Sequence, residues 1–225
     1  MARSKRSKIV NLTTCKPSTR KEKEVLITKV LSLIEDFEYV YVISINNARN
    51  EHLAKLREEW NHSRFLFGKN RLIAHALCLA SEQMGKPKLK DLAQLLRGTS
   101  GLLFSNKDFS ESKEFFDNFR LPGYARTNNI APEEVVLPEG PLFRGQEKIP
   151  HNMEPELRKL GLQTYLDKGE VKLRCDQTIC RAGERLSVSQ AHLLKHFFYM
   201  LAYFQVTIIG YHHDQTLVDL SSSSS

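Results

Sequence analysis

The chain has 225 residues, and 41% of them are hydrophobic, which suits one folded domain or a domain that carries a smaller second module. No run approaches the roughly 18 apolar residues that a membrane-spanning helix needs, and the N-terminus MARSKRSKIV lacks the apolar stretch of a secretory signal. These features exclude a membrane protein, and we expect a soluble, intracellular one.

Positive charge is concentrated near the N-terminus. Residues 1–23 contain eight basic side chains and one acidic side chain, whereas the remaining 202 residues contain 25 of each. A second basic stretch, residues 69–97, contains six basic and two acidic side chains. A basic arm and a basic patch on a neutral body suit a polyanion, because phosphate contacts release counterions. The alternative for the arm is a nuclear-import signal alone.

The cysteines and histidines form no metal-binding motif. There is no Cys-x-x-Cys pair, so free thiols are favoured over disulfides. No Cys/His pair has zinc-finger spacing, and the adjacent His212 and His213 would point in opposite directions on a strand. We expect no metal and no other cofactor. The four cysteines are Cys15, Cys78, Cys175 and Cys180.

Helix and strand patterns alternate through the first half of the chain. A capping box at Thr19 opens a helical periodicity that predicts a helix over 19–37, and YVYVISI predicts a strand over 39–45 that is buried on both faces. The alternation indicates an α/β sandwich, with helices packed on a mixed sheet. The elements predicted next are a helix around Leu53–Trp60, a strand at 64–67, a helix after Gly68, a short helix at 88–96 and a strand at 101–105.

The character of the sequence changes near Arg120. Six of the eight prolines lie between Arg120 and Arg185, among short β-like runs such as EVVLP and EVKLRC and one short helical signal, MEPELRKLGL. SVSQAHLLKHFFYMLAYF then predicts a long apolar helix, and QVTIIGYH predicts a strand. We therefore expect a small α+β module inserted into one discontinuous domain. The predicted boundaries are a basic arm at 1–18, an α/β domain at 19–119 plus 186–220, an inserted module at 120–185 and a disordered serine tail at 221–225.

The turn FGKNR joins a predicted strand to a predicted helix. As a nucleotide-binding P-loop it would need glycine at position 63 and Ser or Thr at position 70, but these positions hold Ser63 and Asn70. The loop therefore cannot wrap a triphosphate and lacks a magnesium ligand. Gly68 still permits a tight turn, and Lys69 and Arg71 flank a helix start, which suits one backbone phosphate. The alternative is an ordinary helix start with solvated charges.

No catalytic arrangement stands out. Cys175 and Arg181 have the Cys-x5-Arg spacing of tyrosine phosphatases, but the flanking residues do not fit and no glycine lies between them, so we interpret Cys175 as a packing thiol. His192 and His196 lie four residues apart on a predicted helix without an evident acidic partner or third ligand. We expect a binding protein and not an enzyme.

Five phrases follow one another along the chain: HSRFLFGKNRLIAHAL, LRGTSGLLFSN, GYARTNNIAPEEVVLPEGPL, PHNMEPELRKLGLQTYLDKGEVKL and GERLSVSQAHLLK. Their order and content resemble the ribosomal large-subunit stalk-base protein family, and within it the ribosome-assembly branch. The resemblance spans about Lys5 to Tyr211. It implies an α/β domain that binds large-subunit rRNA at the stalk base, and an inserted module that in the mature stalk protein faces translation factors.

The resemblance also bears on which branch of the family fits. A mature stalk protein continues into helices that recruit small acidic stalk proteins, whereas this chain ends with Leu220 and five serines, so we expect that it builds no stalk. The resemblance then implies a nuclear and nucleolar placeholder on the pre-60S particle, with neighbouring ribosomal proteins and assembly factors as partners. The resemblance further implies that the mature stalk protein replaces it, with release linked to a phosphatase-like factor. The alternative is a stalk-base protein of the mature large subunit.

We expect recognition of RNA to rest on backbone geometry, 2′-OH groups and exposed loop bases. The arm would supply reach, and the turns after the first two strands, which we expect at one edge of the sheet, would supply a fixed register. The predicted RNA-binding residues are Arg3, Lys5, Arg6, Lys8, Lys16, Arg20, Arg49, Asn50, Lys55, Lys69, Asn70, Arg71 and Arg97.

Overall fold

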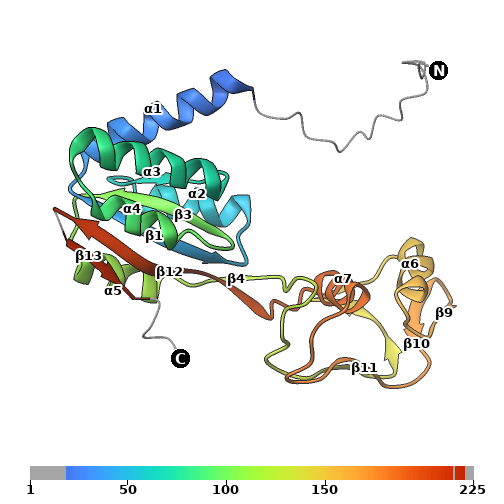
Figure 1. The fold of residues 1–225 in the computed structure, drawn as a ribbon. Helices are drawn as coiled ribbons and strands as arrows, with labels where there is room; N and C mark the ends of the chain where they lie inside the picture. Colours follow the sequence, from blue (N-terminus) through green and yellow to red (C-terminus); the bar gives the residue numbers. More distant parts are fainter. Residues whose placement is uncertain (1–18, 215, 221–225) are drawn as a thin grey trace, which may run out of the picture.

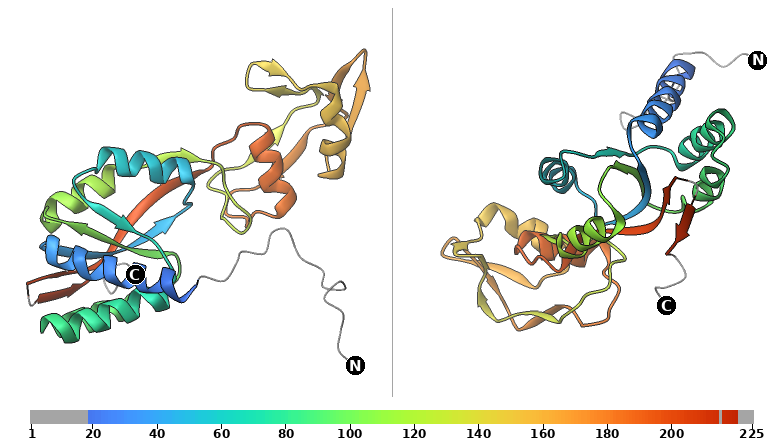
Figure 2. Two further views of the ribbon diagram at one scale, coloured as in Figure 1. Left: turned by 90° about the horizontal axis from the view of Figure 1, so that it is seen from above. Right: turned by 90° about the vertical axis from the view of Figure 1, so that its left-hand side faces the viewer.

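The structure is a computed structural model that describes residues 19–214 and 216–220 (Figure 1). They form an α/β domain and a smaller second body, and the two are joined by strands β4 (Leu121–Gly123) and β12 (Ala202–His213) (Figures 1 and 2). The predicted basic arm and serine tail lie outside the described residues. Within the described part of the chain, every helix is too short or too polar to cross a membrane.

The α/β domain is built on a sheet with the strand order β13-β12-β1-β3-β2, and β4 pairs with the start of β12. β1 is antiparallel to both of its neighbours, β3 and β12, and β3 is antiparallel to β2. The pairing of the described strands is therefore antiparallel throughout, and the mixed sheet predicted from the sequence is wrong, because β3 lies between β1 and β2. The remaining strands are β1 (Tyr39–Asn46), β2 (Arg64–Leu66), β3 (Ser100–Ser105) and β13 (Thr216–Asp219).

Helices cover both faces of this sheet, which confirms the predicted α/β sandwich. α1 (Arg20–Asp36), α3 (Asn70–Met84) and α4 (Lys88–Gln94) pack on one face, and α1 and α3 lie side by side (Figure 2). α2 (Asn50–Glu59) and α5 (Phe109–Asn118) pack on the other face. Side chains of β1 alternate between the two cores, as a central strand requires.

Local signals explain where most of these elements begin. At the start of α1 the Thr19 hydroxyl accepts the backbone N–H of Glu22, and the Glu22 carboxylate accepts the N–H of Thr19, which confirms the predicted capping box. α5 and β13 are additional to the predicted elements. α5 begins where the Asp108 carboxylate accepts the N–H of Glu111 and caps the helix.

The second body consists of short strands and helices. β5 pairs with β11, β6, β10 and β9 form a three-stranded sheet, and β7 and β8 form a hairpin. The α+β character predicted for the insertion is therefore confirmed. The elements are β5 (Val135–Leu137), β6 (Gly140–Pro141), β7 (Phe143–Arg144), β8 (Glu147–Lys148), a 3-10 helix (His151–Met153), α6 (Glu154–Lys159), β9 (Thr164–Asp167), β10 (Glu170–Leu173), β11 (Gln177–Cys180) and α7 (Val188–His196).

The long apolar helix predicted from SVSQAHLLKHFFYMLAYF is wrong. α7 has nine residues and ends at His196, Phe198 has a positive φ of 61°, and the chain is extended in β12 from Ala202 onward. The apolar run therefore serves two elements. Its first part packs as a helix, and its second part continues as a strand of the large sheet.

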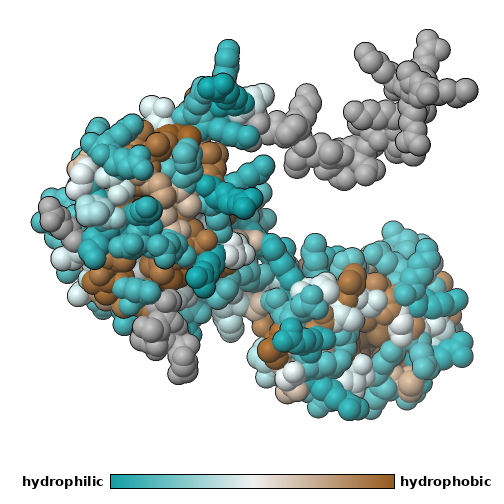
Figure 3. Space-filling view, viewed as in Figure 1, coloured by the Kyte–Doolittle hydropathy of each residue, from teal (hydrophilic) through white to brown (hydrophobic). Residues whose placement is uncertain are grey.

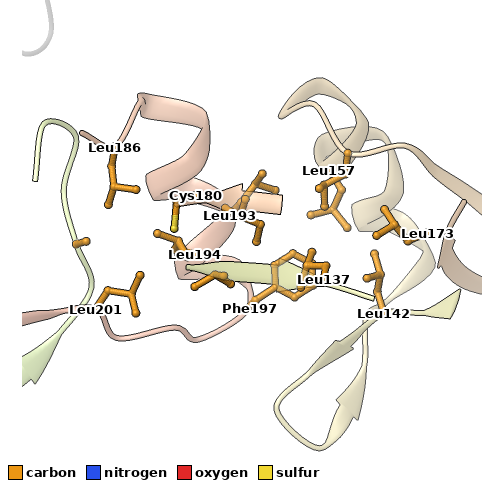
Figure 4. Close-up of a cluster of buried hydrophobic side chains, with 14 of the residues drawn as sticks. Leu137, Leu142, Leu157, Leu173, Cys180, Leu186, Leu193, Leu194, Phe197 and Leu201 are labelled. Atoms are coloured by element: carbon orange, nitrogen blue, oxygen red, sulfur yellow. The ribbon is translucent and has the colours of Figure 1, made fainter. Parts of the chain in front are cut away.

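α7 belongs to the second body rather than to the α/β domain. Its buried side chains Leu193 and Leu194 share one hydrophobic core with Leu137, Leu157 and Leu173 (Figure 4). The same core includes residues up to Leu201, whereas β4 pairs with β12 of the large sheet. By its contacts, the inserted module covers about residues 124–201 and not 120–185, and the α/β domain resumes at β12 and not at residue 186.

The buried His212 on β12 makes stability depend on pH. Its side chain is 2% exposed and its Nε2 atom has no hydrogen-bond partner. Burial, together with smaller effects of the nearby Lys86 and His213 and against an opposing effect of Asp214, lowers the pKa of His212 to about 4.

We predict that the folded protein loses stability as the pH falls from about 6.5 to about 4. In this window the unfolded chain binds the His212 proton and the folded chain does not, so the loss reaches about 3 kcal/mol at its acidic end. The check is urea unfolding of the wild type and of His212→Leu across this pH range. The variant should lose part of the acid sensitivity, whereas the exposed His192→Leu should keep it, and equal pH slopes for all three proteins would contradict the assignment.

Candidate nucleic-acid interface

Three loops of the α/β domain meet at one edge of the sheet. β1 and β2 both end at this edge, and β3, which runs antiparallel to both, begins there. Ser44 pairs with Ser100 and Leu66 pairs with Leu102, so the loops that follow β1 and β2 lie on either side of the loop that precedes β3. The sequence-based expectation that the turns after the first two strands share one edge is therefore confirmed.

A hydrogen bond joins two of these loops directly. The Asn70 side-chain amide Nδ2 donates to the backbone carbonyl of Gly98 at 2.9 Å. This contact holds the first residue of α3 against the loop that carries Arg97. Lys69, Arg71 and Arg97 are exposed around it. We call Asn50, Lys69, Asn70, Arg71 and Arg97 the sheet-end surface.

The start of α3 is suited to an anion. Lys69 is the N-cap residue, and no side chain caps the helix. The backbone N–H groups of Leu72 and Ile73 bind the carbonyl of Lys69, so the preceding N–H groups remain for an external acceptor. Backbone N–H groups at a helix start favour a phosphate, and the side chains of Lys69 and Arg71 add formal positive charge at the same place.

Arg49, which the sequence analysis predicted as an RNA-binding residue, also makes structural contacts within the protein. Its Nη2 atom donates to the backbone carbonyl of Tyr124 at 3.0 Å, and its guanidinium lies 5.8 Å from the centre of the Tyr124 ring. In the opposite direction, the Arg126 guanidinium donates to the carbonyl of Ala48. The two arginines therefore fasten the loop before α2 to the segment that enters the second body.

Sequence reasoning missed Arg126. No local pattern identifies it, because it becomes a neighbour of Ala48 only through the pairing of β4 with β12. The phrase GYARTNN does place an arginine three residues after the end of β4, and this is the one signal that points to the junction.

The other predicted RNA-binding residues are more scattered. Arg20 lies at the start of α1, at the same end of the domain as the sheet-end surface (Figure 1), and its Nε atom pairs with Glu24 at 2.8 Å. Lys55 is exposed on α2, which covers the other face of the sheet from α3. Arg3, Lys5, Arg6, Lys8 and Lys16 lie outside the described residues.

The groups considered for chemistry have structural partners. His196 has an acidic partner that the sequence did not reveal, since its Nε2 atom lies 3.3 Å from a carboxylate oxygen of Glu156 on α6. Cys180 is buried, and burial raises the pKa of its thiol. The exposed Cys175 has its sulfur 3.8 Å from the side-chain oxygen of Gln163. Across residues 19–214 and 216–220, no three His, Cys, Asp or Glu side chains gather in a way that could hold a metal ion.

We predict that Asn70→Ala lowers the free energy of unfolding by about 1 kcal/mol, because it removes the hydrogen bond to Gly98. Asn50→Ala is the matched control, since Asn50 is also the first residue of its helix and makes no side-chain hydrogen bond to another described residue. The measurement is chemical denaturation of both variants. Equal losses in the two would mean that the effect comes from the helix starts and not from the contact between loops.

Two family models match the chain in the same order as its two bodies. Residues 18–120 match the model described as "Ribosomal protein L10", and residues 125–198 match the model of the insertion domain found in the 60S ribosomal protein of this L10 family. The second match ends just after α7, in agreement with the packing of this helix in the second body.

Curated relatives match nearly the whole chain. The protein named "Ribosome assembly factor mrt4" of Neurospora crassa is 36% identical, with 94% of this chain and 89% of that protein covered. "Ribosome assembly factor MRT4" of Saccharomyces cerevisiae is 32% identical, with 96% and 95% covered. "Large ribosomal subunit protein uL10" of Thermococcus onnurineus is 26% identical, with 77% of this chain and 50% of that protein covered. The resemblance seen in the sequence phrases is thus confirmed, and the chain belongs to the Mrt4 family of ribosome assembly factors, a branch of the ribosomal protein L10 family.

Proposed function

We propose that this chain binds pre-rRNA at the stalk base of the pre-60S particle and holds that site until the mature stalk protein replaces it. The observation that carries the proposal is the sheet-end surface. There the bond between Asn70 and Gly98 holds two loops together, and three exposed cations surround the start of α3. Membership in a family of ribosome assembly factors supports the assembly role.

The chemistry of this surface suits an RNA backbone. A helix start with free N–H groups takes one phosphate, and neighbouring Lys and Arg side chains take the phosphates on either side. Because the three loops are fixed by strand pairing, the spacing of these contacts is fixed as well. A fixed spacing of phosphate contacts recognises the shape of a folded RNA, which is how structured RNA is read where base edges are inaccessible.

The role is binding and not catalysis. Relatives are named as assembly factors or ribosomal proteins, and two of the groups considered for chemistry, Cys175 and His196, have polar partners in Gln163 and Glu156. The family resemblance supports two further parts of the proposal. The protein acts in the nucleus and nucleolus, and its release involves a phosphatase-like factor.

We predict that Lys69→Ala combined with Arg71→Ala weakens binding to a stalk-base rRNA fragment. Each lost phosphate contact removes about 0.7 to 0.9 from the slope of log K against log salt, so the slope should flatten by roughly one to two. The measurement is a salt titration of the dissociation constant.

The matched control for this pair is Lys113→Ala with Lys159→Ala. Both lysines are exposed, one on α5 and one on α6. The control therefore also removes two positive charges, but at positions outside the sheet-end surface. It should leave the salt slope close to that of the wild type. An unchanged slope in the Lys69/Arg71 variant, or an equal change in the control, would remove this surface from the proposal.

We predict that the tagged protein sediments with pre-60S particles and is absent from polysomes, and that its fluorescent fusion concentrates in the nucleolus. A placeholder leaves before translation begins, whereas a stalk-base protein of the mature large subunit would travel with polysomes. Gradient fractionation of cell extracts is the measurement. Recovery of the protein in polysomes would favour the mature-subunit alternative.

A further inference from the structure

A groove of about 540 Å³ lies at the junction of the two bodies. Figure 3 shows how narrow this junction is on one face of the molecule. Three segments form its walls: the start of α2, the chain that follows β4, and the end of α7 with the turn after it. Its lining includes Arg49, Asn50, Glu51, Arg126, Lys195 and Met200.

The groove continues the sheet-end surface. Asn50 belongs to both, because it begins α2 at the edge of the sheet and also lines the groove. β4 leads the chain into the second body and β12 leads it back, and β12 pairs with both β4 and β1. A strand of RNA that crosses the loops at Lys69 and Arg97 and continues past Asn50 therefore reaches the groove next.

The charge of the groove fits a polyanion. Three of its lining side chains are basic and one, Glu51, is acidic. Arg49 and Arg126 each use an Nη2 atom to bind a backbone carbonyl, which fixes their positions and leaves further N–H donors. Lys195 is exposed and forms no ion pair with any described residue.

The turn after α7 and the start of β12 present large side chains to solvent. Phe198, Tyr199, Met200 and Tyr203 are all exposed, and Met200 lines the groove. Tyr203 pairs in the sheet with Pro122, another groove residue. Exposed aromatic side chains beside basic ones are the surface that unpaired bases use for stacking.

Phe198 occupies a position that normally favours glycine. The N–H of Tyr199 binds the carbonyl of Leu194, and the N–H of Phe198 binds the carbonyl of Lys195, so Phe198 is the left-handed residue of a Schellman motif, with φ of 61°. A bulky residue is strained in this backbone conformation. Because the Phe198 ring is 44% exposed, its burial contributes little stabilisation to offset that strain. The half-buried Arg144 has its guanidinium over this ring, 4.1 Å from the ring centre.

We propose that the groove, together with the turn after α7 and the first residues of β12, binds an unpaired stretch of the same RNA. This proposal rests on the proposed function. Lys195 and Arg126 bind its phosphates, and one base stacks on the free side of the Phe198 ring. A duplex offers no free base face, so the site takes single-stranded nucleotides. The excess of basic over acidic lining residues favours RNA over a protein partner.

The test uses the full chain and two RNA probes. One is a stalk-base rRNA fragment with its unpaired nucleotides, and the other is the same fragment with those nucleotides closed into continuous duplex. We expect Lys195→Ala and Phe198→Gly each to weaken binding to the first probe roughly fivefold or more, and to change binding to the second probe little. Glycine suits the left-handed backbone of position 198, so the melting temperature of Phe198→Gly should equal or exceed that of the wild type.

Two exposed residues elsewhere in the second body serve as controls. Lys159→Ala removes a charge from α6, and Leu166→Ala removes an apolar side chain from β9, so both should leave binding to the first probe unchanged. If Lys195→Ala and Phe198→Gly bind the first probe as the wild type does while the Lys69/Arg71 variant is weakened, this inference is overturned and the proposed function stands. If these variants keep RNA affinity and are lost only from pre-60S particles, the surface docks a protein, which also overturns it.

Discussion

The central position of β1 is the constraint on which the rest of the molecule depends. β1 is buried on both faces and is antiparallel to β3 on one side and to β12 on the other. Its side chains alternate between two cores, so a shift of one residue would exchange the two faces. This fixed register decides which loops share an edge of the sheet. It therefore places the starts of α2 and α3 beside the loop that carries Arg97.

β12 extends this constraint to the second body. It pairs with the whole of β1, and its first residues pair with β4, so the chain leaves and re-enters the α/β domain on adjacent strands. At the other end β12 pairs with β13 and contacts α4. Gly210 allows both approaches, because a Cβ atom there would lie 2.7 Å from Leu95 and 2.8 Å from the carbonyl of Val218. One strand thus carries the insertion and closes the sheet.

Sequence patterns predicted the elements whose signals are local. α1 had a capping box, β1 had a β-branched and aromatic run, and both lie where they were expected. The errors came where the deciding contact is distant in sequence. The apolar residues around Phe198 led to the prediction of a helix. The residues that follow form a strand because they pair with β1, which is distant in sequence. β13 has only four residues, two polar and two apolar, so its pairing with β12 alone defines it.

In the candidate site, too, residues with a local sequence signal were predicted, and residues whose role depends on a contact distant in sequence were not. Lys69, Asn70 and Arg71 were identified from one turn, and strand pairing placed that turn beside the loop of Arg97. The junction with Arg126 was missed, because its partner, Ala48, lies 78 residues away. The role of Arg49 could not be read from its charge, since a guanidinium that holds a backbone carbonyl looks the same in sequence as one that meets phosphate.

The distribution of charge separates long-range attraction from local positioning. The net charge of +7 equals the excess in residues 1–23, so the rest of the chain attracts RNA only through local clusters such as the sheet-end surface. The N-terminal charges act over distances limited by salt, whereas charges on fixed loops select a geometry. At the junction, Arg49 and Arg126 bind backbone carbonyls across it. The loop that leads to Asn50 therefore also holds the second body. An RNA that orders this loop must bias the position of the second body, and by reciprocity a partner that moves the second body must change the affinity for RNA.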